Sequence, residues 1–427
     1  MPRIFRITFF AIAGYLLSGT LHTAGAQSGG YPVVHQYSPV EYGHNPNNLG
    51  VAFSPEGMLY VANQEGILEF DGARWKLISL PVRRIPSSLS VNSRGQVLIG
   101  ASGDIGILGA DSLYRPAFKS LLATQSVERN RFDGIEKIIN IKESSIFVSS
   151  SRLYRSTPDT VYTLIPGAPI QSSFSNRDSV FVSLWGRGLT TLTSKGFEDV
   201  PSGNFLARDA LEHAATLNDS TTLLITASDA FFTYQRGAIA PWDSTYRMAL
   251  AGKSVVSSYL LSDGTLALGL QRSGLALISP GKSIRFLTYK DGIPLGSING
   301  VSEDASGRIW LATEDGIASV DLHSAVSAPP TSAGLTGSVS SISLMGENLY
   351  VGTDRGLFLS DPISQAPPAR FSRVSDLDIP VRSMLALNND LFLGGGDELI
   401  IIPQQIAALR YSLQLGYPVR VLLASEH

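Results

Sequence analysis

Hydrophobic and polar positions follow one another in short runs along the whole chain. Examples are VFVS (180–183), IWLA (309–312), LYVG (349–352) and LFLG (391–394). These runs are rich in β-branched or aromatic residues, and Gly, Asn, Asp and Ser bound them. This combination is typical of short strands joined by hairpins. The pattern therefore predicts β structure from end to end.

The runs belong to a repeat. Each copy has a tight turn ending in Gly, an apolar run, a small residue, a second tight turn and another apolar run. Clear copies span 54–72, 92–108, 262–278, 304–321 and 344–361, and weaker ones 144–156, 178–192, 220–234 and 388–402. The second apolar position falls at Tyr60, Leu98, Phe147, Phe181, Leu224, Ala267, Trp310, Tyr350 and Phe392. These positions span 332 residues in eight steps, a mean spacing of 41.5.

Each copy supplies two strands, and the apolar stretches before and after it supply two more. Four short antiparallel strands in about 41 residues make the blade of a β-propeller. The chain is therefore predicted to be an all-β protein, a β-propeller of about nine four-stranded blades. A single extended β-sandwich does not explain the regular period. Glycines mark two predicted hairpin turns in the copies. They are Gly57, Gly95, Gly264 and Gly307 at the first turn and Gly66, Gly106, Gly188, Gly274, Gly316 and Gly356 at the second.

Nine copies exceed the four to eight blades that are common in such rings. Two solutions follow: a single ring of eight or nine blades, or a seven-bladed ring followed by two blades of an incomplete second ring. The segment 33–38 (VVHQYS) resembles an outermost strand and precedes the first full copy. It is therefore expected to pair with the last blade and close the ring.

The first 26 residues are expected to be a signal peptide. Arg3 and Arg6 precede an apolar stretch at 7–17, and Ala24-Gly25-Ala26 supplies the small residues of a cleavage site. A retained membrane anchor is the alternative, but the apolar stretch is short of the about 20 residues that span a bilayer. Residues 27–403 then form the propeller repeats, and 404–427 a C-terminal tail that is a last strand pair or a truncated blade. The mature protein is expected in the periplasm or outside the cell.

Composition narrows the functions. The chain is 44% hydrophobic and 16% charged, with a formal net charge of −3. It has no basic run that would follow a phosphate backbone, so no nucleic acid is expected as a partner. The chain has no cysteine, which excludes thiol catalysis, cysteine-bound zinc and iron–sulfur clusters. No cofactor is expected, and no second long apolar segment follows residue 27.

The copies at 304–321 and 344–361 resemble two-component regulator propeller repeats. The residues that match are Asp304, Gly307, Ile309, Trp310, Thr313 and Gly316 in the first, and Tyr350, Gly352, Thr353, Gly356 and Leu357 in the second. The segment 37–78 is similar to the first blade of Bacteroidetes-type periplasmic sensors, and 100–108 to their second. The resemblance covers roughly residues 35 to 403.

This resemblance implies the extracytoplasmic ligand-sensing region of a hybrid histidine kinase or a related regulator. Such relatives continue into further blades, an immunoglobulin-like domain, a transmembrane helix and a cytoplasmic effector. The residues after 402 have neither the length of a transmembrane helix nor a kinase or helix-turn-helix signature. The chain is therefore interpreted as a truncated sensor or as a stand-alone propeller that works with a separate partner.

No catalytic set is recognisable, so the chain is not expected to be an enzyme. Ser302, Asp304, Gly307 and Trp310 approach the Asp-box of sialidase-like propellers, but with one extra residue and between the first two strands of the blade. The paired carboxylates of a glycosidase cannot be identified. No two histidines have metal-ligand spacing, so they are expected to be isolated surface or loop residues and no metal is predicted.

The candidate ligand site lies on turns between the second and third strands of the blades. These turns share one face of the ring beside the mouth of its channel, and loops on a rigid scaffold are where binding residues concentrate. The residues singled out are Trp185, Arg187, Arg272, Glu314, Asp315 and Arg355. A tryptophan stacks on a sugar ring, and arginines bind hydroxyls or carboxylates.

The expected function is thus a ligand-sensing or ligand-binding propeller for a carbohydrate or another polar ligand. Its partner would be a small molecule, an oligosaccharide or another exported protein. The alternatives are a propeller enzyme, such as a lyase or glycosidase, and a protein-interaction scaffold. Ordinary solvated hairpin tips would also account for the charged residues on the turns.

Overall fold

A computed structural model shows nine four-stranded antiparallel sheets, each with the strand order of a propeller blade. The structure describes residues 32–423 except 82–83, 124–133, 280, 282–283, 323, 325–333, 361–369, 375–376, 378 and 404–410. The predicted signal peptide at 1–26 lies outside the described residues. All nine copies of the repeat form the second and third strands of a sheet, so the fold class read from the sequence is confirmed.

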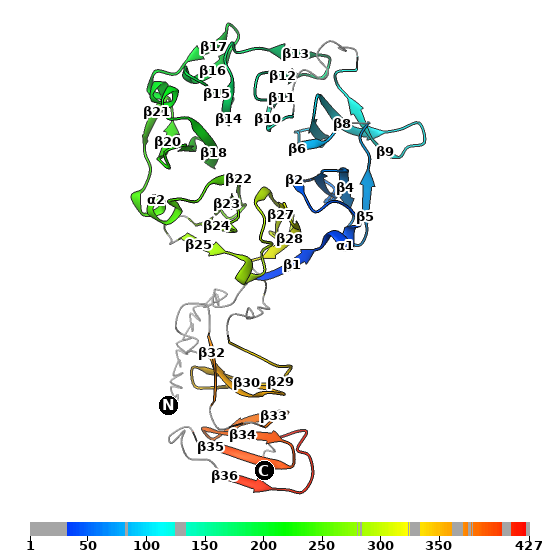
Figure 1. Ribbon diagram of the computed structural model, residues 1–427, viewed down its shortest axis with the longest axis vertical. Helices are drawn as coiled ribbons and strands as arrows, with labels where there is room; N and C mark the ends of the chain where they lie inside the picture. The colour runs from blue at the N-terminus through cyan, green and yellow to red at the C-terminus, as the bar shows by residue number, and fades with distance from the viewer. Residues whose placement is uncertain are drawn as a thin grey trace, which may run out of the picture.

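Seven of the sheets form a closed ring (Figure 1). Blade 1 comprises β2 (Asn48–Phe53), β3 (Leu59–Asn63), β4 (Gly66–Phe70) and β5 (Trp75–Ile78), and blade 2 comprises β6 (Pro86–Val91), β7 (Val97–Ala101), β8 (Asp104–Ala110) and β9 (Pro116–Ser120). Blade 3 comprises β10 (Lys137–Ile141), β11 (Ser144–Val148), β12 (Leu153–Ser156) and β13 (Val161–Leu164). Blade 4 comprises β14 (Ile170–Asn176), β15 (Ser179–Leu184), β16 (Gly188–Thr193) and β17 (Gly196–Asp199).

The other half of the ring follows the same order. Blade 5 comprises β18 (Leu211–Asn218), β19 (Thr221–Thr226), β20 (Phe231–Gln235) and β21 (Ala238–Pro241), and blade 6 comprises β22 (Val255–Leu260), β23 (Leu266–Leu270), β24 (Leu275–Ile278) and β25 (Ile284–Leu287). Blade 7 takes β26 (Ile298–Glu303), β27 (Ile309–Thr313) and β28 (Gly316–Asp321) from the chain in sequence. Its fourth, outermost strand is β1 (Val33–Tyr37), which precedes blade 1.

The pairing of β1 with β28 closes the ring. The two strands are antiparallel, with Val33 opposite Asp321 and Tyr37 opposite Ile317. Tyr37 also stacks on Trp310 of blade 7, with ring centroids 5.3 Å apart, and meets Trp75 of blade 1 edge-on at 5.6 Å. The predicted closing strand therefore exists, but it completes the seventh copy of the repeat and not the ninth.

The last two sheets lie outside the ring (Figure 1). They comprise β29 (Val339–Met345), β30 (Asn348–Thr353), β31 (Gly356–Ser360) and β32 (Phe371–Arg373), then β33 (Ser383–Leu387), β34 (Asp390–Gly395), β35 (Glu398–Pro403) and β36 (Tyr411–Gln414). Of the two solutions that the sequence left open, the structure has the seven-bladed ring followed by two blades of a second set.

The short helices are α1 (Pro39–Tyr42), α2 (Ser244–Leu250) and the 3₁₀ turns η1 (Pro201–Ala207) and η2 (Tyr289–Asp291).

The hydrophobic core is divided into layers between neighbouring blades. One layer holds Leu59, Leu68, Trp310 and Ile317 between blades 1 and 7, and similar layers follow around the ring. Trp310 is 5% exposed, and its indole N–H donates to Asp304 at 2.9 Å. The motif around Asp304 is thus a hairpin turn plus an inter-blade core residue.

The predicted turn glycines mostly have the left-handed backbone that the turns require. Gly57, Gly95, Gly264 and Gly307 have φ between +75° and +84°. In the second set Gly106 differs, because it lies within β8 and the turn of blade 2 is made by Gly103, with φ +64°. Gly106 is needed for space, since a Cβ there would lie 2.5 Å from the Lys119 carbonyl oxygen.

Candidate functional site

The predicted turns do share one face of the ring with the starts of the innermost strands. In six ring blades the first turn residue donates its backbone N–H to the residue just before the innermost strand. Gln64 donates to Asn47 (3.2 Å), Trp185 to Pro169 (2.9 Å) and Glu314 to Ser297 (3.2 Å). A ligand at this face would meet both the turns and the first residues of the innermost strands.

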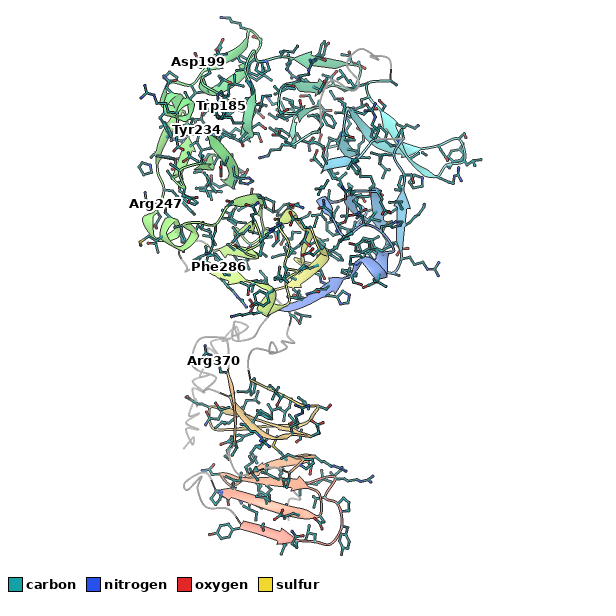
Figure 2. The ribbon with its side chains drawn as sticks, viewed as in Figure 1. Trp185, Asp199, Tyr234, Arg247, Phe286 and Arg370 are labelled. Carbon is teal, nitrogen blue, oxygen red and sulfur yellow. The ribbon has the colours of Figure 1, made fainter. Side chains whose placement is uncertain are left out.

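Trp185, which Figure 2 labels, and Arg187 lie on the turn between β15 and β16 of blade 4. The Trp185 side chain is 67% exposed. The Arg187 guanidinium donates to the Asp199 carboxylate at 2.6 Å and to the Phe197 carbonyl at 2.9 Å, both on the outermost strand β17. Trp185 is therefore accessible, whereas Arg187 is directed along its own blade.

Arg272 on blade 6 and Glu314 on blade 7 come together across a blade boundary, and Asp315 follows Glu314 on the same turn. Arg272 Nε lies 3.8 Å from a Glu314 oxygen, and the same carboxylate accepts the Ser297 N–H at 3.2 Å. Arg355 belongs to the turn between β30 and β31, on a sheet outside the ring. The six predicted residues therefore divide into three separate locations.

The centre of the ring holds a cavity of about 620 Å³ (Figure 2). All seven innermost strands line it, so it occupies the channel of the propeller. Nine hydroxyl side chains contribute, namely Ser87, Ser88, Ser90, Ser172, Ser173, Ser257, Ser258, Tyr259 and Ser302. The volume lies within the range of about 300 to 1,000 Å³ that is usual for small-molecule sites.

A β-bulge at the start of the innermost strands directs side chains into this cavity. The strand register shifts by one residue in six ring blades, and the extra residues are Leu49, Ser87, Gln171, Glu212, Val256 and Asn299. In blade 3, the Glu136 N–H bonds to Val148 O while Lys137 is paired with the same residue, which places Glu136 at the equivalent point. All seven of these residues, here called the bulge positions, line the cavity. Bulges commonly re-aim side chains next to binding sites.

The residues that follow the bulges are here called the inner positions: Gly50, Ser88, Lys137, Ser172, His213, Ser257 and Gly300. Charge is concentrated on one side, because Glu136 and Lys137 of blade 3 face the cavity with Glu212 and His213 of blade 5. Blade 4, between them, contributes the small or neutral Gln171 and Ser172. The cavity therefore has a charged wall from blades 3 to 5.

Lys137 extends past blade 4 to blade 5. Its ammonium donates to the carbonyl oxygen of Ala214 at 3.3 Å. The side chain keeps some exposure through the channel, yet protein atoms surround it on all other sides, and this burial lowers the pKa of Lys137 to about 8. Burial also raises the pKa of Glu136. At neutral pH the lysine is still mostly cationic.

His213 lies beside this lysine. Its Nε2 is 2.9 Å from Ser258 Oγ on blade 6, so the imidazole is held between blades 5 and 6. Burial, together with the positive charge of Lys137, lowers the pKa of His213 to about 3. The imidazole is therefore neutral at physiological pH. The expectation that the histidines are isolated surface or loop residues does not hold for His213.

The opposite wall has no charged side chain. Blades 7 and 1 present Gly300, Val301, Gly50 and Val51, together with the polar side chains of Asn299 and Ser302. A Cβ on Gly300 would lie 3.0 Å from the Gly50 Cα, so the two innermost strands are in close contact. A bound molecule would meet charged groups on one side and a close-packed, uncharged surface on the other.

The residues that sequence reasoning missed are Glu136, Lys137, Glu212 and His213. The sequence does contain a signal that could have found them. Within the ring, the copies of the repeat are weak in blades 3, 4 and 5, and these four residues lie on blades 3 and 5. In blades 1, 2, 6 and 7 the inner position is paired with Ala62, Gly100, Gly269 or Ala312, which is the small residue of the repeat. In blades 3 to 5 the paired residue is Val148, Ser183 or Ile225. Departure from the repeat marks the charged wall.

Two features of the described residues bear on the chemistry. Among them, no group of three or more His, Asp or Glu side chains is arranged to hold a metal ion. No helix in the described segments is long and apolar enough to cross a membrane. The polar side-chain groups that the cavity does supply are one ammonium, one neutral imidazole, two carboxylates, two amides and nine hydroxyls.

The fold is similar to that of the extracellular domains of putative two-component systems. The extracellular domain of the putative hybrid two-component system BT3049 from B. thetaiotaomicron matches 90% of this chain with a TM-score of 0.65 and 13% identity. That of the putative hybrid two-component system BT4673 from the same organism matches 88% with a TM-score of 0.53 and 14% identity. A streptogramin B lyase matches 68% of this chain and 97% of its own length, with a TM-score of 0.52 and 14% identity.

At these identities the likeness is one of fold. The chain spans 54% and 52% of the two extracellular domains. No family model matches the chain, and no curated protein matches it. The two extracellular domains match about nine-tenths of this chain, whereas the streptogramin B lyase matches 68% of it.

Proposed function

We propose that the chain is the ligand-binding part of an exported sensor, and that its seven-bladed ring binds a carbohydrate or another small polar ligand in the central cavity. The cavity carries this proposal. It is large enough for a small molecule, and the bulge positions of all seven innermost strands line it. Bulges next to active sites commonly re-aim side chains, and here they bring Glu136, Gln171, Glu212 and Asn299 to the cavity.

Two further observations support a sensor. The fold resembles the extracellular domains of putative two-component systems over about nine-tenths of the chain. The N-terminal residues have the composition of a cleavable signal peptide, so we place the mature protein in the periplasm or outside the cell. Signal transfer would then need a membrane-spanning partner or a further segment.

The turns at the face of the ring are proposed as outer contacts for a ligand that extends beyond the cavity. Trp185 is the exposed aromatic side chain suited to stack on a sugar ring. The Arg272–Glu314 pair and Asp315 would contact its polar groups. Arg187, which is paired with Asp199, would act mainly by holding its turn in place.

The test is thermal unfolding and calorimetry of the mature chain with a panel of mono- and oligosaccharides. A ligand that binds the native state raises Tm, by an amount that grows with its concentration. Glu136→Gln and Glu212→Gln remove cavity carboxylates while keeping side-chain size. Each is expected to weaken binding about tenfold, since a hydrogen bond to a charged group contributes about 1.5 to 3 kcal/mol.

Arg355→Ala is the matched control, because it removes a similar turn residue on a sheet outside the ring. It should leave the ligand-induced shift unchanged. Trp185→Ala separates the two regions: it weakens binding of oligosaccharides but not of monosaccharides if the turns are outer contacts. A ligand shift that survives both glutamate substitutions would contradict the cavity as the site.

A second candidate is a propeller enzyme of the lyase or glycosidase class. The fold likeness to a streptogramin B lyase favours it, and the cavity supplies the His213 imidazole and two carboxyl groups as candidates for proton transfer. It predicts turnover of a bound glycan or glycoconjugate that His213→Ala abolishes. Binding without any turnover across the panel supports the sensor.

A further inference from the structure

Lys137 is a cation without a counter-charge in the described part of the chain. The ion pairs among the described residues place no carboxylate within 4 Å of its ammonium, and its single hydrogen bond is to the Ala214 carbonyl. Glu136 and Glu212 line the same cavity from the bulge positions without pairing with it. An ammonium has three N–H groups, so its further bonding capacity is available to a molecule in the cavity.

Packing does not require a lysine here. Five of the seven ring blades have Gly or Ser at the inner position, and those blades form the same four-stranded sheets. Placing an ammonium among protein atoms is unfavourable unless an opposite charge or several acceptors compensate. The lysine therefore lowers the stability of the empty protein, which points to a role in binding.

The neighbouring charges determine which ligand fits. His213, held by Ser258, is a neutral hydrogen-bonding group next to the ammonium. Glu136 and Glu212 lie one position nearer to the start of their strands and carry negative charge. The cavity therefore has a narrow positive region at the inner positions and a negative region at the bulge positions.

We propose that this cavity binds a small acidic sugar, with its single carboxylate on the Lys137 ammonium and its hydroxyls on Glu136, Glu212 and the serines of the innermost strands. This inference rests on the proposed function and names the class of ligand. A sugar with one carboxylate matches both regions of the cavity. A second carboxylate on the ligand would meet the two glutamates and be repelled, so dicarboxylates are excluded.

The experiment measures binding of D-glucuronate and D-galacturonate by calorimetry and thermal shift. Glucose, galactose and the dicarboxylate galactarate are the comparison compounds. The uronates are expected to bind at least tenfold more tightly than the neutral sugars or galactarate. Lys137→Met should reduce uronate affinity at least tenfold and lower the affinity for neutral sugars much less, while Lys137→Arg retains part of the preference for uronates.

Lys195→Met is the matched control, since Lys195 is an exposed lysine on the turn of another blade. It should bind uronates like the wild type. Lys137→Met is expected to have a Tm equal to or above that of the unliganded wild type, because it removes a charge without a partner. Should that variant fold poorly, Lys137→Gln provides the same test with a polar side chain.

The outcomes are distinguishable. Sugar binding that is indifferent to the carboxylate or to Lys137 would overturn this inference and leave the proposed function standing. Lys137-dependent binding of amino acids instead of uronates would overturn the assignment to a sugar. Absence of saturable binding by any compound in the acidic and neutral panels counts against the proposed carbohydrate site as well.

Discussion

At the inner position, most ring blades have Gly or Ser, but blades 3 and 5 have Lys137 and His213. Burial acts on these two side chains in the same direction, because it disfavours the cationic form of each. The two differ in charge at neutral pH, since lysine starts from a much higher pKa. One wall of the cavity therefore combines an ammonium with a neutral imidazole.

His213 makes a specific contribution to acid sensitivity. In the unfolded chain it takes up a proton near pH 6.5, whereas in the folded protein it does so only near pH 3. The unfolded state thus binds more protons between these values, and the free energy of unfolding falls as pH falls through this window. His213→Gln should remove up to about 1.4 kcal/mol per pH unit of this loss.

Urea unfolding of the wild type and His213→Gln between pH 4 and 7 measures this effect. The stability of the variant should improve relative to the wild type as pH is lowered. Lys137→Met should give part of the same change, because the lysine charge contributes to the shift. Parallel pH profiles for all three proteins would show that His213 is not the responsible group.

At the scale of the element, the small residue in each clear copy of the repeat allows neighbouring blades to approach. Gly100 of β7 is paired with Ser88 of β6 and lies against Ile135 at the start of blade 3. A Cβ at Gly100 would collide with the Ser88 hydroxyl and lie 2.5 Å from the Ile135 Cβ. The pairing of a small residue with Gly or Ser thus allows neighbouring blades of the repeat to pack closely.

Gly100→Ala is therefore expected to destabilise the protein by about 1 to 3 kcal/mol, the usual effect of overpacking. Ser88→Gly should be well tolerated alone, because the Ser88 hydroxyl is buried and has no hydrogen-bond partner. The double variant should recover part of the loss, since one of the two collisions is removed. Chemical denaturation of the four proteins gives the coupling energy, and strict additivity would contradict this account.

At the scale of the whole molecule, the ring is closed by an element far away in sequence. β1 pairs with β28, and Tyr37 packs with Trp310 and Trp75 at the boundary of blades 7 and 1. An open ring would expose the faces of its first and last blades to water. The closing strand therefore contributes to the stability of blades that it does not itself touch.

Tyr37→Ala should lower the free energy of unfolding by about 3 to 5 kcal/mol, as for removal of a large core side chain. Tyr37→Phe keeps the ring contacts and is expected to cost about 1 kcal/mol or less, since only the hydroxyl is lost. Thermal unfolding and limited proteolysis of both variants measure the effect. Equal stability of the alanine and phenylalanine variants would show that the aromatic packing is not what closes the ring.

The ring and the two following sheets are proposed to be separate folding units. The layer of core residues between β29–β32 and β33–β36 includes Met345, Leu357 and Leu391, and the ring's layers involve other residues. A chain of residues 27–322 should therefore fold, keep the ligand-induced rise in Tm and lack one unfolding transition. Calorimetric scanning of both chains tests this, and loss of ligand binding in the shorter chain would contradict it.

The sequence by itself determined the features that depend on near neighbours in the chain. The nine copies, the strands of each blade and most turn glycines follow from local alternation of residues and from the φ angles that hairpins require. The copy containing Asp304 and Trp310 already identified the turn at Gly307 and the strand that follows it. These features are decided within about 20 residues of one another, so periodicity shows them directly.

Only the tertiary structure decided the number of blades in the ring and the location of the cavity residues. Ring size depends on how the core layers set the angle between blades, and β1 and β28 are separated by almost the whole ring. Lys137 approaches Ala214 and His213 across blade 4, at a distance fixed by that ring size. The composition of the turns at Arg187 and Arg355 suggested a binding face. Packing decides that Arg187 pairs with Asp199 and that Arg355 belongs to a sheet outside the ring. Residues whose proximity depends on the closure of seven blades leave no local pattern in the chain.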